Sequence, residues 1–299
     1  MQPNVLILRA PGTNCDLETA FAFEKAGAKV ERLHVNRVLE SPSVLTQFQI
    51  LCLPGGFSYG DDIAAGRILA NQIEHHLGEA MARFKDDGKL ILGICNGFQI
   101  LIKSGLLLDQ RGRESLSGAK KSPETDRERE PLATLTWNDS GQYEDRWARV
   151  GTHGSKCVFL KDIDEMYLPV AHAEGKFVAR DEAALEQLDA AGQLVLRYLP
   201  LDAPARSTAP ERVGRLGVLK KSGAATPSDA NRQLPFPDNP NGSMGNVAGV
   251  CDSTGRVLGL MPHPERHITR TQHPRWTRPE TTRTGDGLKM FENAVAYFA

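Results

Sequence analysis

Short apolar runs alternate with amphipathic segments along the first hundred residues of the chain. The runs have the length and apolar character of buried strands, and we predict strands over 4–8, 29–33, 49–53 and 89–94. Apolar residues recur at helical spacing between them. We predict a first helix that is capped by Asn14, ends at Gly27 and carries Leu17, Ala20 and Phe21. A long helix is predicted from about Asp61 to Gly88, with an apolar face that begins at Ile63, and a short helix over 96–104. This alternation favours an α/β fold, a mostly parallel sheet with helices on both faces.

The rest of the chain is less regular. We predict strands over 150–152, 166–171 and 194–199, a hairpin of 247–252 and 256–261 around Ser253-Thr254-Gly255, and a closing amphipathic helix with Leu288, Phe291, Val295 and Phe298. Three segments differ in composition: 109–130 has six acidic and six basic residues, 200–246 is rich in Pro, Gly, Ser and Asn, and 266–283 carries five Arg. No linker separates two complete strand–helix sets. We therefore expect one domain, 1–299, with insertions at these three places.

Composition excludes several classes of protein. The chain has 299 residues, 40% of them apolar, and 36 Lys and Arg against 37 Asp and Glu. This balance argues against a nucleic-acid binder. No apolar run reaches the length of a membrane span, so we expect no membrane partner and no export. The five cysteines show no CxxC spacing, which disfavours a disulfide framework or zinc cage and fits a cytoplasmic location.

The strongest chemical signal is Cys95, which lies between a predicted buried strand and a helix. Gly93 and Gly97 flank it at two residues on either side, a spacing typical of a sharp nucleophile elbow. A thiol there lies at a helix N-terminus, which favours the reactive thiolate, and the N–H of Asn96 can face a developing oxyanion. The alternative is a small buried side chain at a strand end, but the paired glycines favour the nucleophile.

Two further strand ends carry candidate chemistry. Gly55 and Gly56 follow the third predicted strand, where a backbone N–H can complete an oxyanion hole; a plain tight turn is the alternative. Prolines on both sides of His263 favour extended backbone, which places His263 and Glu265 on the same side. A carboxylate beside an imidazole is the base–orienter pair of a cysteine triad. A surface loop or a metal site with His267 are alternatives, but spacing supplies no third metal ligand, so we expect no metal.

In this order, the three elements resemble the class I (triad) glutamine amidotransferases, which have a flavodoxin-like sheet. Longer strings resemble one branch of that class, the glutaminase subunits of phosphoribosylformylglycinamidine synthase, the PurQ family. The matching strings are RAPGTNCD at 9–16, GGFSYGDD at 55–62, GICNGFQ at 93–99, NPNGS at 239–243 and MPHPER at 261–266. A further segment, AHAEG at 171–175, has Ala173 where the family pattern has glycine.

The resemblance implies roles for the matching residues. Cys95 would attack the side-chain amide of L-glutamine, His263 would transfer protons, and Glu265 would orient His263. The implied glutamine-binding residues are Gly55, Gly56, Phe57, Asn96, Gln99, His172 and Glu174. Cys15 lies in a family loop without an implied role, and we interpret Cys52, Cys157 and Cys251 as packing residues.

The resemblance also implies partners. The chain would pass ammonia to a synthetase subunit (PurL), assisted by a small subunit (PurS), which converts formylglycinamide ribonucleotide to formylglycinamidine ribonucleotide in purine biosynthesis. We expect no cofactor in this chain, with ATP and Mg on the synthetase. The segment 266–283 is a candidate docking site for an acidic partner surface, although a solvated loop is the stronger interpretation. The alternatives are another cysteine hydrolase of the same fold and a non-catalytic assembly subunit.

Overall fold

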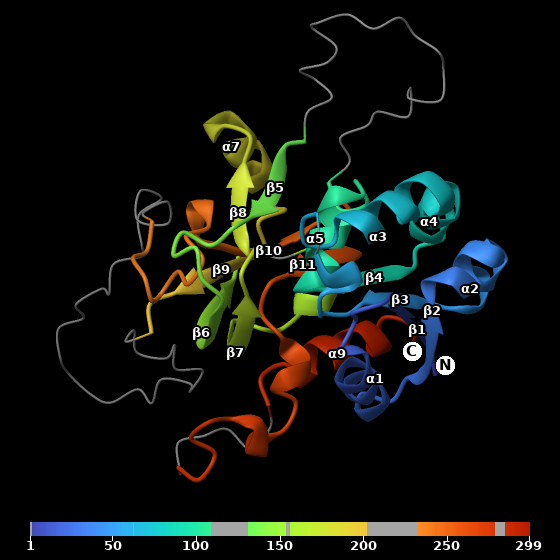
Figure 1. The fold of residues 1–299 in the computed structure, drawn as a ribbon. Coiled ribbons are helices and arrows are strands. Elements are labelled where there is room, and N and C mark those ends of the chain that lie inside the picture. Colours follow the sequence, from blue (N-terminus) through green and yellow to red (C-terminus); the bar gives the residue numbers. More distant parts are fainter. Residues whose placement is uncertain (1, 62, 109–130, 154–155, 202–232, 279–284) are drawn as a thin grey trace, which may run out of the picture.

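A nine-stranded mixed sheet organises the computed structural model, which describes residues 2–61, 63–108, 131–153, 156–201, 233–278 and 285–299 (Figure 1). The strands, in spatial order, are β2 (Lys29–His34), β1 (Asn4–Arg9), β3 (Ile50–Leu53), β4 (Leu90–Ile94), β11 (Val257–Leu260), β10 (Val247–Cys251), β9 (Leu196–Leu199), β6 (Glu144–Thr152) and β7 (Glu165–His172). The first five strands run parallel to one another, and every pair from β11–β10 onward is antiparallel. The predicted α/β fold class is confirmed.

Helices cover both faces of the parallel half of the sheet. Figure 1 shows α1 and α9 together on one side and α3, α4 and α5 on the other. The helices of the described residues are α1 (Asp16–Lys25), α2 (Val35–Glu40), α3 (Arg67–Gln72), α4 (Gly78–Asp86), α5 (Asn96–Lys103), α7 (Glu182–Ala190) and α9 (Leu288–Ala296). Phe23 of α1 and Phe291 of α9 pack edge to face, with ring centroids 4.9 Å apart. None of the described helices is long and apolar enough to cross a bilayer.

The second, smaller sheet pairs β5 (Ala133–Thr136) with β8 (Lys176–Ala179), two strands that the apolar pattern did not predict. Each alternates buried and partly exposed residues over only four positions. The predicted hairpin is present, since β10 and β11 pair antiparallel with Gly249 opposite Leu260. The segment 109–130 lies outside the described residues.

Only one of the three apolar residues predicted on the first helix faces the core. Leu17 and Phe21 are 64% and 54% exposed, whereas Ala20 and Phe23 are buried. The helix begins at Asp16, with Cys15 and not Asn14 at its N-cap, and turns its Thr19–Ala20–Phe23 side to the core. A short amphipathic helix with apolar residues on both sides does not reveal from spacing alone which side is buried.

The predicted helix from Asp61 starts later than expected. Tyr59 and Asp61 have positive φ angles, Ile63 is 72% exposed, and α3 begins only at Arg67. A wider π-helical turn at Ile73–Leu77 then joins α3 to α4. Residues 58–61 and 63–66 therefore precede the helix, and Ser58 and Asp61 hydrogen-bond to the side chain of Asn96, the residue after Cys95.

Candidate active site

Cys95 occupies a tight turn between β4 and α5. Its backbone angles are φ 51° and ψ −108°, in a region that residues with a Cβ rarely adopt. Glycine is required at position 97, two residues after Cys95, because a Cβ there would lie 1.9 Å from the carbonyl oxygen of Leu53. The turn predicted from the flanking glycines is present. It fixes the thiol at the carboxyl end of a buried strand, beside the N-terminus of α5.

His263 and Glu265 form a buried pair after β11. His263 Nδ1 lies 2.6 Å from Glu265 Oε1, and the two side chains are 2% and 0% exposed. Burial alone lowers the pKa of His263, but the carboxylate of Glu265 and the neighbouring thiols Cys95 and Cys15 outweigh it and raise the pKa well above its ordinary value. The carboxylate thus stabilises the imidazolium, the form that a base acquires when it accepts a proton.

The sheet brings Cys95 and His263 together although they are far apart in the sequence. β4 and β11 are parallel neighbours, with Ile94 opposite Leu260, and the N–H of Cys95 donates to the carbonyl of Leu260 at 2.8 Å. The carboxylate of Glu265 is hydrogen-bonded to Nδ1 of His263, and Nε2 of His263 is buried without a hydrogen-bond partner among the described residues. The ring therefore has one nitrogen available for a proton transfer with the thiol.

Gly55 and Gly56, which follow β3, lie close to His263, Cys95 and Asn14. A Cβ at Gly55 would lie 2.8 Å from His263 Cε1 and 3.5 Å from Cys95 Cβ, and one at Gly56, where φ is 136°, would lie 2.7 Å from the N atom of Asn14. Only glycines permit these approaches. Within the described part of the chain, no hydrogen-bond acceptor is assigned to the backbone N–H of Gly56, and the same holds for that of Asn96. Phe57, the next residue, is 42% exposed, and its ring centroid is 6.4 Å from that of Tyr143.

The predicted residues Asn96, Gln99 and Glu174 lie in one polar network with the backbone of Ser58 and Ala65. Asn96 Oδ1 accepts from the N–H of Ser58 at 3.3 Å, and Asn96 Nδ2 donates to Gln99 Oε1 at 2.9 Å. Gln99 Nε2 donates to the carbonyl of Glu174. The Glu174 carboxylate accepts from the N–H of Ala65 at 3.3 Å. These hydrogen bonds join α5 to Ser58, and they join Glu174, which follows β7, to both α5 and Ala65.

His172 is a neutral histidine beside the site. Asn138 donates from Nδ2 to the carbonyl of His172 and accepts at Oδ1 from the N–H of Gly175, so the 3.2 Å contact to Oδ1 requires a proton on His172 Nδ1. Nε2 is then a bare acceptor, buried and without a partner among the described residues. Burial first, and then the charge of His263, lower the pKa of His172 to about 3. His172 therefore offers an acceptor at neutral pH.

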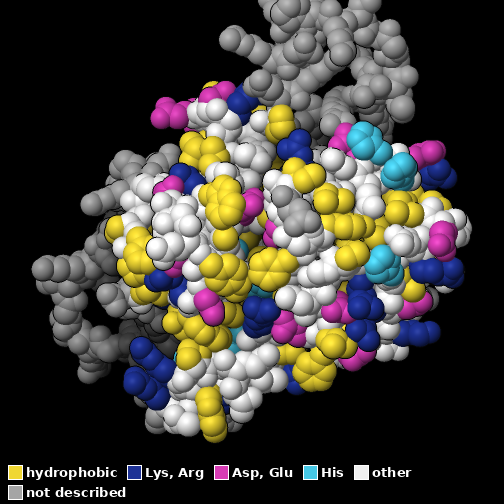
Figure 2. Space-filling view, in the orientation of Figure 1, with side chains coloured by type: hydrophobic (Ala, Val, Ile, Leu, Met, Phe, Trp, Pro, Cys, Tyr) yellow, Lys and Arg dark blue, Asp and Glu magenta, His cyan; other side chains and the backbone are white. Residues whose placement is uncertain are grey.

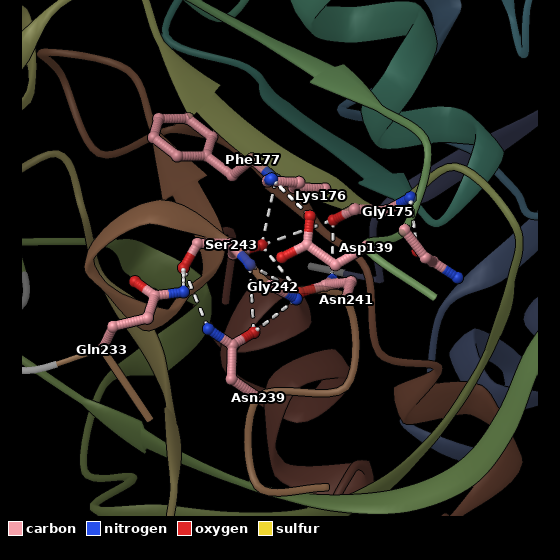
Figure 3. Close-up of polar contacts among 10 residues, drawn as sticks. Asp139, Gly175, Lys176, Phe177, Gln233, Asn239, Asn241, Gly242 and Ser243 are labelled. Atoms are coloured by element: carbon pink, nitrogen blue, oxygen red, sulfur yellow. Dashed lines mark hydrogen bonds and ion pairs between the residues drawn. The ribbon is translucent and has the colours of Figure 1, made fainter. Parts of the chain in front are cut away.

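The NPNGS string holds the segment that follows His172 (Figure 3). Asn241 Nδ2 donates to the carbonyl of Gly175 at 2.7 Å, and the hydroxyl of Ser243 accepts from the N–H of Phe177 at 2.9 Å. Asn239 Oδ1 in turn accepts from the N–H of Ser243 at 3.1 Å. The stretch 200–246, which we predict to be an insertion, ends in buried residues, since Asn239, Asn241 and Ser243 are at most 2% exposed. Polar composition concealed this buried polar network; residues 202–232 lie outside the described part.

The Arg-rich segment 266–283, another predicted insertion, follows directly after Glu265. Its first residues are packed, since His267 and Ile268 are each 1% exposed. Arg266 donates from Nε to Glu18 at 2.9 Å and from Nη2 to Cys15 Sγ at 3.2 Å. The residues 279–283 lie outside the described part.

Sequence reasoning missed two side chains beside the pair His263–Glu265. Cys15 and Arg266 both belong to the quoted family strings, yet nothing in their spacing indicates that they meet. Cys15, His263 and Glu265 each offer one metal-ligand atom, and these atoms lie within 4.8 Å of one another. Among the described residues, this group is the one that has the composition of a metal site.

Comparisons with known proteins agree with this geometry. The family model described as a CobB/CobQ-like glutamine amidotransferase domain matches residues 2–211 and 226–298. A phosphoribosylformylglycinamidine synthase subunit PurQ of Dehalococcoides mccartyi is 42% identical over 293 residues, covering 98% of this chain and 96% of that protein. Its counterpart in Methanococcus maripaludis strain S2 is 35% identical over 306 residues, covering 99% and 97%.

A solved structure shares the fold over its full length. The PurLQS structure from Thermotoga maritima contains a chain that is 26% identical, with a TM-score of 0.64 and full coverage of both chains. Its fold agrees with the mixed, largely parallel sheet described above. On these matches, the chain belongs to the CobB/CobQ-like glutamine amidotransferases and, within them, to the PurQ family.

Proposed function

We propose that this chain is the glutaminase subunit of phosphoribosylformylglycinamidine synthase in purine biosynthesis, and that Cys95, His263 and Glu265 carry out its reaction. The observation that carries the assignment of residues is the buried 2.6 Å pair of His263 and Glu265 beside a thiol held in a strained strand-to-helix turn. This arrangement has the nucleophile, base and orienting carboxylate of a cysteine triad.

The reaction starts at the side-chain amide of L-glutamine. His263 accepts the proton of the Cys95 thiol, and the sulfur attacks the amide carbon. The N–H groups of Gly56 and Asn96 donate to the oxyanion, a contribution that is typically about 10²–10³ in rate for each donor. His263 then protonates the departing nitrogen, and ammonia leaves a thioester on Cys95.

Water completes the cycle. His263 removes a proton from the water as it attacks the thioester, and the returning proton restores the Cys95 thiol as glutamate departs. Glu265 holds the imidazole through Nδ1 in every step, so Nε2 always faces the reacting atoms. Phe57, Gln99, His172 and Glu174 border the space for glutamine; the bare Nε2 of His172 suits a substrate N–H.

Ammonia passes in this proposal to a PurL synthetase subunit, within an assembly that also contains PurS, and ATP and Mg act on the synthetase. Figure 2 shows hydrophobic side chains gathered across the middle of the face that it views. Phe57 and Tyr143, which are 42% and 50% exposed, belong to the exposed aromatic residues of the chain. Exposed aromatic side chains near a site favour a partner surface. A reducing cytoplasm suits the Cys95 thiol.

The test measures glutamine hydrolysis by the chain alone and after addition of the synthetase, small subunit, ATP and ribonucleotide. We expect low basal activity, strong stimulation, and loss of both in Cys95→Ala, with Cys251→Ala as the matched control. Hydrolysis that persists in Cys95→Ala rejects the triad. A normal rate in Glu265→Gln rejects the orienting role of the carboxylate. Stimulation by a different synthetase alone assigns the chain to another pathway, and full assembly with an inactive triad favours a non-catalytic subunit.

A further inference from the structure

Cys15 brings a second thiol to the imidazole of His263. The Cys15 side chain is 1% exposed. A Cβ at Gly55 would lie 3.1 Å from Cys15 Sγ and 2.8 Å from His263 Cε1, so the sulfur and the ring edge border the same point. The proposed reaction does not use this thiol, although it helps to raise the pKa of His263.

Cys15, His263 and Glu265 together have the donor atoms that a borderline-soft cation prefers. Zn²⁺ binds thiolate sulfur at about 2.3 Å and imidazole nitrogen or carboxylate oxygen at about 2.0–2.2 Å, which places the ligand atoms around one ion roughly 3–4 Å apart. The donor atoms of Cys15, His263 and Glu265 lie within 4.8 Å of one another, so only a small displacement is required.

An unpartnered oxygen points to a ligand at this place, because Glu265 Oε2 is buried and has no hydrogen-bond partner among the described residues. The ring nitrogen that can share an ion with Glu265 is Nδ1, which lies 2.6 Å from Glu265 Oε1, since Nε2 is on the opposite edge of the ring. An ion between Nδ1 and the carboxylate replaces the proton that they share. The remaining imidazole proton then lies on Nε2, the nitrogen that faces the reacting atoms.

The surrounding charges allow a bound thiolate. Burial raises the pKa of the Cys15 thiol, while His263 and Arg266 act in the opposite direction. Arg266 donates to Cys15 Sγ at 3.2 Å, and its own charge is paired with Glu18 at 2.9 Å. A metal ion displaces the proton of a thiol ligand on binding, so the raised pKa makes the affinity depend on pH without preventing binding.

We propose that Zn²⁺ binds to Cys15, His263 and Glu265 and that this binding stops glutamine hydrolysis, because His263 can no longer accept the proton of Cys95. The inhibition rests on the proposed function; the binding does not. Mg²⁺ prefers oxygen ligands and does not compete for this site. Cys95 is not a ligand in this proposal.

The test uses the full-length chain and four variants. Cys15→Ala and the more conservative Cys15→Ser remove the proposed ligand, Cys251→Ala removes a buried thiol elsewhere, and Cys95→Ala removes the proposed nucleophile. Zn²⁺ affinity is measured by calorimetry. Co²⁺ is a spectroscopic probe, because a cobalt–thiolate bond produces a charge-transfer absorption. We expect both Cys15 variants to weaken Zn²⁺ binding at least about tenfold and to lose the cobalt band. Cys251→Ala retains both.

Hydrolysis by the assembled complex supplies the second measurement. Zn²⁺ inhibits the wild-type and Cys251→Ala complexes at the same concentration, whereas both Cys15 variants require at least about tenfold more, and excess EDTA restores activity. Unchanged Zn²⁺ affinity or unchanged inhibition in the Cys15 variants overturns the proposal, and so does loss of the cobalt band in Cys95→Ala. A Cys95→Ala chain that still hydrolyses glutamine refutes the proposed function instead and leaves the binding isotherm unaffected.

Discussion

The turn at Cys95 predicts an unusual difference in stability between two inactive variants. With φ 51° and ψ −108°, Cys95 lies outside the small left-handed region open to residues with a Cβ. Such a backbone costs about 1–3 kcal/mol, and the ψ angle places this residue near the upper end. Glycine adopts the same angles without a steric cost. Cys95→Gly relieves the strain, whereas Cys95→Ala retains it.

The magnitude follows from three contributions. Both variants lose the same buried sulfur, so its contribution cancels. Relative to alanine, glycine gains about 3 kcal/mol from relieved strain, loses about 0.8 kcal/mol from the missing buried methyl group, and loses about 0.5–1 kcal/mol from its greater freedom in the unfolded chain. We therefore expect Cys95→Gly to be about 1.5 kcal/mol more stable than Cys95→Ala.

Equilibrium unfolding in urea, followed by tryptophan fluorescence, measures the difference. Both variants should show the same m value, with a higher midpoint for Cys95→Gly. A Cys95→Gly chain as stable as Cys95→Ala, or less stable, refutes the idea that the backbone at Cys95 is strained. Packing around Cys95 would then be sufficient to set its position.

Three further predictions concern the surroundings of the site. Gly97→Ala places a Cβ 1.9 Å from a backbone oxygen and should cost at least about 3 kcal/mol, which urea unfolding measures; a loss below 1 kcal/mol contradicts the close contact. Asn241→Ala removes the 2.7 Å hydrogen bond to the carbonyl of Gly175 and should cost about 1–3 kcal/mol and raise KM for glutamine. An unchanged midpoint and KM contradict the role of Asn241 in holding this segment. The pKa of His172 is lowered to about 3, so the unfolded chain binds this proton first, and stability is full above about pH 6.5 and falls as the pH drops toward 3. His172→Asn should flatten that decline in a pH series of unfolding curves, and an equally steep decline argues against a neutral buried histidine.

Much of the parallel half of the sheet could be predicted from the sequence. The runs that became β1, β3 and β4 are almost wholly buried, and continuous burial produces a continuous apolar pattern. The elbow at Cys95 was predictable for a different reason: its glycines are demanded by local geometry. In contrast, β5 and β8 are short and half exposed, so four residues do not distinguish them from a loop.

Long-range polar contacts account for most of what the sequence did not reveal. Cys15 and Arg266 meet only because α1 and the residues after β11 pack against each other, and no local pattern encodes that contact. Asn241 and Ser243 have the composition of a surface loop, yet their hydrogen bonds to residues 175 and 177 allow them to be buried. Buried polar networks of this kind depend on partners that single-residue preferences do not specify.

The pairing of β4 with β11 has a consequence for how the enzyme is inactivated by heat. The N–H of Cys95 is itself part of that pairing, through its 2.8 Å bond to Leu260, and both strands are fully buried in the centre of the sheet. Amides in such central strands exchange with solvent only through the largest unfolding events. We therefore expect the spacing between Cys95 and His263, the proposed nucleophile and base, to survive local fluctuations of the outer loops and to be lost on heating only when the sheet melts.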